Sequence, residues 1–173
     1  MTSLAVIVGL LFAGHQPAQQ QRTSRGALAG IESNFDQRFE KFNIADPFDL
    51  LGNTRGVYLP GYGVVFSAEL NLVVTANPSP FRAPFTKQDI ARLHAHKLER
   101  VPQLKQIMRE MLITAATSLD NVAPNEQIVL AVSLFHFSWE DASGLPGQIV
   151  VQAQRQQLLN GATRESAIRT EEY

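Results

Sequence analysis

Residues 55–74 read RGVYLPGYGVVFSAELNLVV, a turn followed by a segment in which apolar and polar residues alternate. Residues 59–62 (LPGY) have the composition of a type II turn, with proline in the second position and glycine where a positive φ is needed. From Phe66 to Leu72, apolar residues alternate with polar ones, so one face of this segment is polar. The pattern predicts an antiparallel strand in a sheet that is covered on one side only.

The longest helical pattern lies downstream of this strand. Apolar residues recur over residues 90–119, mostly every three or four positions. Residues 86–89 (TKQD) fit a capping box, with aspartate in place of the usual glutamate. Pro102 interrupts the pattern, because proline lacks the N–H that a helix interior needs. We therefore expect two helical segments, at residues 87–100 and 102–119.

Three further segments complete the expected domain. Residues 27–42 carry apolar side chains at helical spacing. Residues 126–139 are rich in β-branched and aromatic residues and apolar on both faces, as in a central strand, and residues 149–154 alternate like a last strand. We predict a single α+β domain over residues 27–159, an antiparallel sheet of about four strands with helices packed on one face.

The beginning of the chain indicates export. Residues 4–13 (LAVIVGLLFA) form an apolar run of ten. As a helix this run spans about 15 Å, half of a ~30 Å bilayer core, which is typical of a signal peptide. We interpret residues 1–18 as a signal peptide, residues 19–26 as a flexible linker and residues 160–173 as a loose polar tail. The alternative is that the apolar run is a buried first strand or helix of the domain.

Composition narrows the classes of function. The 173 residues carry a formal net charge of −1, so there is no concentrated basic field and we expect no nucleic-acid partner. The chain has no cysteine, which excludes thiolate catalysis, disulfide exchange and cysteine-ligated metal sites. The glycines of residues 56–63 precede no helix that could bind a phosphate, and the common hydrolase motifs are absent. We therefore expect no cofactor.

One corner of the sequence carries groups that could do chemistry. His136, Glu140 and Asp141 lie at the end of the predicted strand, beside a glycine turn. On a strand His136 and Glu140 would share a face. An imidazole next to a carboxylate is a common part of general-base sites and of metal sites. These three residues are the catalytic candidates, against the alternative of a strand end where aromatic and polar side chains meet solvent. The candidate metal ligands are His94, His136 and Glu140, with Asp120 and Glu69 as further possibilities.

The helical region 86–119 raises two other questions. His94 and His96 are two residues apart, so on a helix they point to nearly opposite sides and one metal ion cannot easily bind both. The same region is rich in lysine and arginine and carries a net positive charge. This positive face could contact an anionic membrane surface or an acidic partner, or it could be an ordinary solvated face.

These observations favour an exported binding or structural module over an enzyme. We expect a periplasmic or secreted protein that does not span the membrane after processing and whose partner is an envelope protein or a small ligand. The alternative is a small hydrolase or metal-dependent enzyme that uses the corner of His136, Glu140 and Asp141. A second histidine or carboxylate at ligand distance from His136 would favour that alternative.

Overall fold

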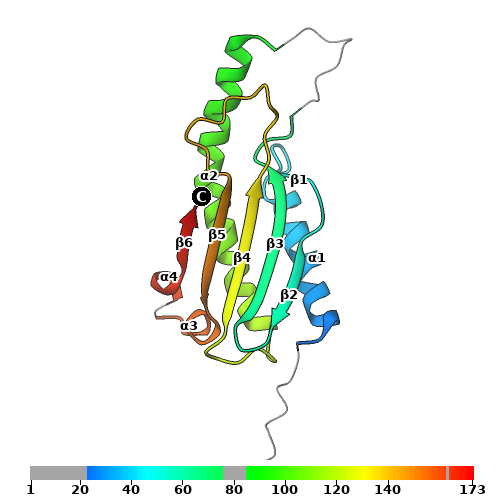
Figure 1. The fold of residues 1–173 in the computed structure, drawn as a ribbon, viewed down its shortest axis with the longest axis vertical. Coiled ribbons are helices and arrows are strands. Elements are labelled where there is room, and N and C mark those ends of the chain that lie inside the picture. Colours follow the sequence, from blue (N-terminus) through cyan, green and yellow to red (C-terminus); the bar gives the residue numbers. More distant parts are fainter. Residues whose placement is uncertain (1–22, 76–84, 163) are drawn as a thin grey trace, which may run out of the picture.

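The computed structural model describes residues 23–75, 85–162 and 164–173 (Figure 1). The predicted signal peptide and the first half of the predicted linker lie outside the described residues, and residues 25 and 26 of that linker belong to a helix. In chain order the elements are α1 (Arg25–Lys41), β1 (Asp49–Leu50), β2 (Arg55–Leu59), β3 (Gly63–Asn71), α2 (Lys87–Ser118), β4 (Gln127–Leu134), β5 (Gln148–Gln154), α3 (Arg155–Leu159), α4 (Arg164–Ala167) and β6 (Arg169–Glu172).

The strands form one sheet with the order β1-β3-β4-β5-β6, and β2 pairs with β3 on the same side as β1. Figure 1 shows α1 and α2 together behind this sheet, so the predicted α+β class with helices on one face is confirmed. The described chain has six strands, two more than the four that we expected. None of its helices combines the length and the apolar character that crossing a bilayer would require.

One pair of central strands differs from the expected antiparallel arrangement. β3 and β4 run parallel, with Val64 opposite Ile128, whereas every other pair is antiparallel. The reason is the connection between them, because α2 carries the chain back along the sheet before β4 begins. Parallel neighbours need such a crossover, whereas a hairpin would have made the pair antiparallel.

The longest helix is continuous through Pro102, so the prediction of two segments is wrong. α2 runs for 32 residues and begins with the predicted capping box between Thr86 and Asp89. Pro102 and Leu98 both lie on an exposed side of α2. Because proline has no N–H, the Leu98 carbonyl has no partner at position 102, and water can reach this carbonyl instead. This lowers the free-energy cost of a proline inside the helix.

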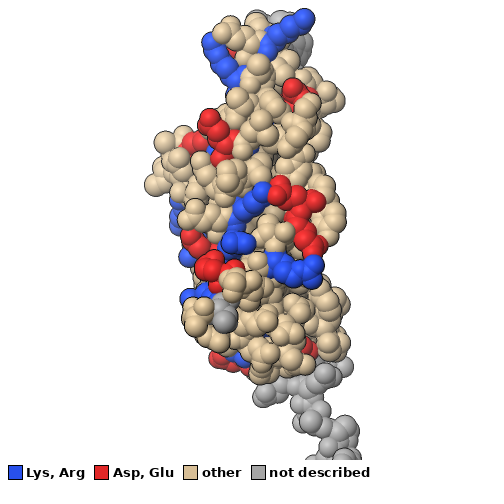
Figure 2. All heavy atoms as spheres, turned by 90° about the vertical axis from the view of Figure 1, so that its left-hand side faces the viewer, with Lys and Arg blue, Asp and Glu red and all other residues tan. Residues whose placement is uncertain are grey.

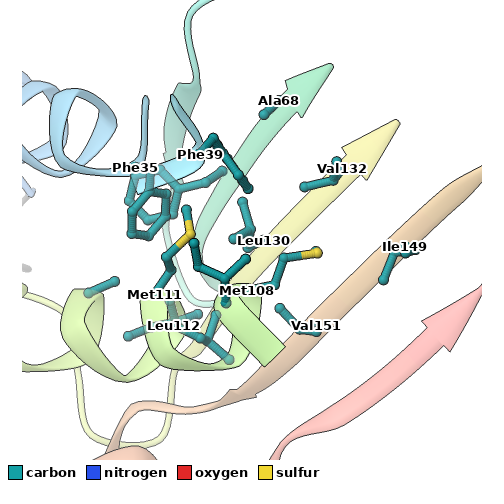
Figure 3. Close-up of a cluster of buried hydrophobic side chains, with 14 of the residues drawn as sticks. Phe35, Phe39, Ala68, Met108, Met111, Leu112, Leu130, Val132, Ile149 and Val151 are labelled. Carbon is teal, nitrogen blue, oxygen red and sulfur yellow. The ribbon is translucent and has the colours of Figure 1, made fainter. Parts of the chain in front are cut away.

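The core lies between the helices and the sheet. The side chains of Phe35, Phe39, Met108 and Met111 have no exposed surface. Figure 3 shows them with Leu112 on the helix side of the cluster, packed against the sheet side chains Ala68, Leu130, Val132, Ile149 and Val151. Each large apolar side chain buried in this way contributes about 1.5–3 kcal/mol, so the interface between helices and sheet provides most of the driving force for folding.

Glu126 fastens the β2–β3 turn to the start of β4. Its buried carboxylate accepts hydrogen bonds from the Tyr58 hydroxyl at 3.0 Å and from the Gly61 N–H at 3.1 Å. Burial and the neighbouring carboxylate raise the pKa of Tyr58. Gly61 has a φ of 80°, and the Tyr62 N–H donates to the Leu59 carbonyl at 3.0 Å, which confirms the predicted tight turn.

The free edge of β2 is closed at Gly56 by two side chains of α1. The Gly56 N–H donates to Glu32 Oε1 at 2.6 Å, and the Gly56 carbonyl accepts from Arg25 Nη1 at 3.0 Å. Arg25 and Glu32 also form an ion pair with each other. Burial alone would raise the pKa of Glu32, but the hydrogen bonds from Arg25 and Gly56 outweigh burial and lower it. An incoming strand thus finds the Gly56 backbone groups already bonded.

The opposite edge is formed by residues that we predicted to be a loose tail. Within residues 160–173 the chain makes the short helix α4 and the strand β6. Ile168 is buried in the core, and β6 pairs with β5 along Arg169–Glu172. One buried isoleucine followed by four polar residues has no clear strand period, so only pairing with β5 shows that this segment is part of the domain.

Candidate functional site

Residues 135–147 connect β4 to β5 at the end of the sheet where β3 also finishes. The Phe135 N–H donates to the Leu70 carbonyl at 2.9 Å, and the Leu134 N–H donates to the Gly147 carbonyl at 2.8 Å. β4 has partners on β3 as far as Leu134 and on β5 as far as Ser133, so it ends at Leu134 and does not reach residue 139 as expected. The prediction that His136 and Glu140 share a strand face is wrong, because both lie in the connecting segment.

Glu140 is turned into the protein, where it pairs with Lys97 of α2. A turn directs it there, since the Glu140 N–H donates to the Phe137 carbonyl at 3.0 Å. The side chains of Lys97 and Glu140 are each 1% exposed and form an ion pair. Trp139, the residue before Glu140, stacks on Phe85 with a distance of 4.1 Å between the ring centroids. A carboxylate held in this way is neutralised by a buried ammonium group and is not presented to solvent.

The other two members of the predicted corner face different partners. Asp141 Oδ1 accepts a hydrogen bond from the Ser143 N–H at 2.9 Å, and bonding to Ser143 lowers the pKa of Asp141. The Asp141 backbone carbonyl accepts a hydrogen bond from His94 Nδ1 at 2.9 Å. His136 is exposed and has no hydrogen bond or ion pair with a histidine or carboxylate of the described chain. The structure thus does not bring the three side chains together around one reacting atom.

The candidate metal ligands are also spread over separate contacts. His96 bonds to Asp46 Oδ2 at 3.0 Å, on a different side of α2 from the contact of His94. Asp120 pairs with Arg155 at 3.2 Å, and Glu69 is exposed in β3. Among the residues that the structure describes, no three histidine or acidic side chains are close enough together to hold a metal ion.

A buried arginine near this corner was missed by the sequence reasoning. The Arg100 side chain is 1% exposed, donates from Nε to the Leu72 carbonyl at 3.2 Å and lies 3.4 Å from Asp46. Its guanidinium group sits 4.1 Å from the centre of the Phe48 ring, a cation–π contact. Burial lowers the pKa of Arg100, and the charge of Asp46 opposes this shift.

One sequence signal could have revealed the buried cations. Lys97 lies four residues after Leu93 and four before Val101, so it occupies the apolar stripe of α2 and not the opposite face. The basic face considered for this helix is accordingly not one surface. Lys97 and Arg100 are buried, and Lys105 pairs with Glu172 at the far edge of the sheet.

The face of the sheet turned away from the helices is the second candidate site. Strand side chains alternate between faces, and those paired with the core residues on β3, β4 and β5 point toward the helices. The opposite face is free of charge along its centre, with charges only at its rim. Its central side chains are Val65, Ser67, Gln127, Val129, Ala131, Ser133, Gln148, Val150, Gln152 and Gln154, and its charged rim is Arg55, Glu69, Arg169 and Glu171.

At one end this open face is hollowed. A pocket of about 280 Å³ is lined by Tyr62, by Arg169 and by glutamines of β4, β5 and α3. On β2 and in the turn after it, Val57, Leu59 and Tyr62 are each between 43% and 50% exposed. Exposed apolar and amide groups without central charges have the composition of a protein interface, where charged residues are depleted from the centre and kept to the rim.

Comparisons with known proteins found no relative of this chain. No family model and no curated protein matches the sequence, and no solved structure matches the fold. The geometry of the two candidate sites is therefore the basis for a functional assignment.

Proposed function

We propose that this chain is an exported binding module and that the open face of its sheet contacts a protein of the cell envelope or its surroundings. The observation that carries the proposal is the charge-free centre of this face. A sheet face that only meets water usually carries polar and charged side chains, whereas charged residues are depleted from the centre of protein interfaces. Here the middle three strands present valine, alanine, serine and glutamine, and charges appear only on the outer strands and the end of β3.

The geometry of the corner argues for binding over catalysis. A general base must lie within hydrogen-bond reach of the proton that it removes, with a second group to orient it. His136 has no such orienting carboxylate, and Glu140 is already paired with Lys97. The hydrolase or metal-enzyme alternative thus lacks an assembled set of groups in the described residues.

Export is the second part of the proposal, and it rests on the apolar run at residues 4–13. We expect the mature protein isolated from its native host to begin near Gln19, after cleavage beside Ala18. Mass spectrometry of the intact protein and of its N-terminal peptide measures this directly. A product that keeps Met1 and stays in the cytoplasm would contradict export.

The contact surface can be tested by site-specific photo-crosslinking in the native host. When Val150 is replaced by a benzophenone amino acid, irradiation should give one discrete crosslinked adduct with the partner protein. The same replacement at Gln88, an exposed residue of α2, should give none. The partner named by mass spectrometry is then purified and titrated against the parent and against Ala131→Arg. A charge at the centre of an interface should weaken binding by about tenfold or more, which corresponds to ~1.4 kcal/mol.

The matched control for this titration is Gln88→Arg, which adds the same charge far from the open face. It should bind the partner as the parent does, and both variants should melt within a few degrees of the parent. Normal binding by Ala131→Arg, or the absence of an adduct at Val150, would show that the open face is not the contact surface.

A further inference from the structure

β6 leaves part of its backbone unbonded at one lateral edge of the sheet (Figure 1). Tyr173 and Gln148 exchange both backbone hydrogen bonds, at 3.0 and 3.1 Å. Such pairs alternate along an antiparallel ladder, so the N–H and C=O groups of Thr170 and Glu172 point away from β5. Within the described residues, these four groups form no backbone hydrogen bond.

A groove runs directly beside this free edge. Its volume is about 570 Å³, and Thr170 and Glu172 belong to its lining. The other wall is the side of α2 that carries Pro102, Lys105, Gln106, Arg109 and Glu110. Figure 2 looks onto this side of the molecule and shows lysine, arginine and acidic side chains gathered together in its middle. The two residues with free backbone groups thus line a hollow between a strand and a helix.

The two edges of the sheet are treated differently. At the β2 edge, Glu32 and Arg25 occupy both backbone groups of Gly56. At the β6 edge, Arg109 donates to the Ile168 carbonyl, just before the strand, at 3.4 Å and to the Thr170 side-chain hydroxyl at 3.3 Å. Within the described residues it does not bond the backbone N–H or C=O of Thr170. Proteins commonly protect free edges against other chains, so an edge that faces a groove and remains unbonded is a place where another chain can pair.

The charges of the groove favour a basic side chain in its occupant. Its lining has three carboxylates, Glu110, Glu165 and Glu172, against the two cations Lys105 and Arg109. Lys105 pairs with Glu172. Arg109 lies 4.0 Å from Glu165, whose side chain is 71% exposed. One carboxylate therefore remains in excess.

We propose that an extended segment of another protein binds in this groove as an additional strand beside β6, with a lysine or arginine pointing between α2 and β6. Backbone hydrogen bonds to Thr170 and Glu172 provide affinity, and the groove selects the alternate side chains. This inference does not depend on the open sheet face, because the groove lies on the side of α2 and the lateral edge of β6.

The probe for the test is a displayed library of random linear twelve-residue peptides, selected against the full chain. Enriched peptides should be rich in lysine and arginine. In amide-exchange NMR, a saturating peptide should slow the exchange of the Thr170 and Glu172 amides by about tenfold or more. The Glu171 and Tyr173 amides should change little, because they already bond to β5.

Two variants locate the peptide on the edge. Thr170→Pro removes one outward N–H, and edge strands accept proline where the N–H faces solvent, so this variant should fold and lose peptide binding by about tenfold or more. Its matched control is Thr170→Val, which keeps the N–H and should bind nearly as the parent does. Glu110→Gln with Glu165→Gln should weaken binding about two- to fivefold, whereas Glu40→Gln on α1 should not.

Several results would overturn the proposal. These are a selection without enriched peptides, peptides that bind Thr170→Pro as tightly as the parent, or unchanged exchange at Thr170 and Glu172 with peptide bound. If light scattering shows a doubled mass and these two amides become protected without peptide, a second copy of the chain is the occupant instead. Ala131→Arg should bind the peptides like the parent, so failure of the open-face proposal and failure of this one are distinguishable.

Discussion

Gly63→Ala is expected to destabilise the protein by roughly 3–5 kcal/mol, through backbone strain and overpacking together. Gly63 has a φ of 133°, a conformation that residues with a side chain rarely adopt. A Cβ atom at this position would lie 1.9 Å from the Gln127 carbonyl oxygen. The backbone of β4 would have to move away, and this is where the parallel pair β3–β4 begins.

Gly61→Ala is the matched control, two residues earlier in the same turn. Gly61 also has a positive φ, of 80°, but no atom lies within 4 Å of a Cβ added there. This variant should therefore cost only about 1–2 kcal/mol of conformational strain. Urea unfolding of the two variants beside the parent measures the difference. Equal losses for both would mean that β3 and β4 do not approach so closely at Gly63.

Lys97→Met is expected to cost about 3–5 kcal/mol, because it leaves the buried Glu140 carboxylate without its partner. Both side chains are 1% exposed, so solvent cannot replace the lost interaction. The double variant Lys97→Met with Glu140→Leu removes both charges and should recover most of this loss, since well-packed apolar residues can replace a buried ion pair. A double-mutant cycle of unfolding free energies gives the coupling between the two residues.

Lys105→Met on the same helix is the control for this cycle. Lys105 pairs with Glu172, and their side chains are 29% and 43% exposed. An ion pair that solvent reaches contributes about 0–1 kcal/mol, so this variant should melt close to the parent. Two results would contradict a stabilising role for the buried Lys97–Glu140 ion pair between α2 and residues 135–147. One is a loss of stability in Lys97→Met as small as that in Lys105→Met, and the other is a double variant that is less stable than either single variant.

Local signals in the sequence were sufficient for most of the secondary structure. The apolar stripe of α1, the capping box at Thr86 and the alternation after the Leu59–Tyr62 turn each depend on residues close together in the chain. Period and capping act over one or two turns of backbone, so these elements and the α+β class can be read without knowing their neighbours. The uncovered sheet face follows from the same alternation, because a polar row on a strand needs no helix above it.

The candidate corner could not be predicted in the same way. Its interpretation required β4 to continue to residue 139, but β4 ends at Leu134, where its pairing with β3 and β5 runs out. Burial of Glu140 depends on Lys97, which is 43 residues away. No local pattern reports a partner at that separation. The position of Lys97 in the apolar stripe of α2 was the one available sign that this cation is buried.

The positions of the helices and main strands and the open sheet face follow from local patterns, because they depend on near neighbours in the chain and on period. Long-range packing is needed to explain why β3 and β4 run parallel, why Ile168 anchors a sixth strand and why the side chains of His136, Glu140 and Asp141 do not meet. Each of these depends on contacts between distant segments, whose energies appear only when those segments pack against each other.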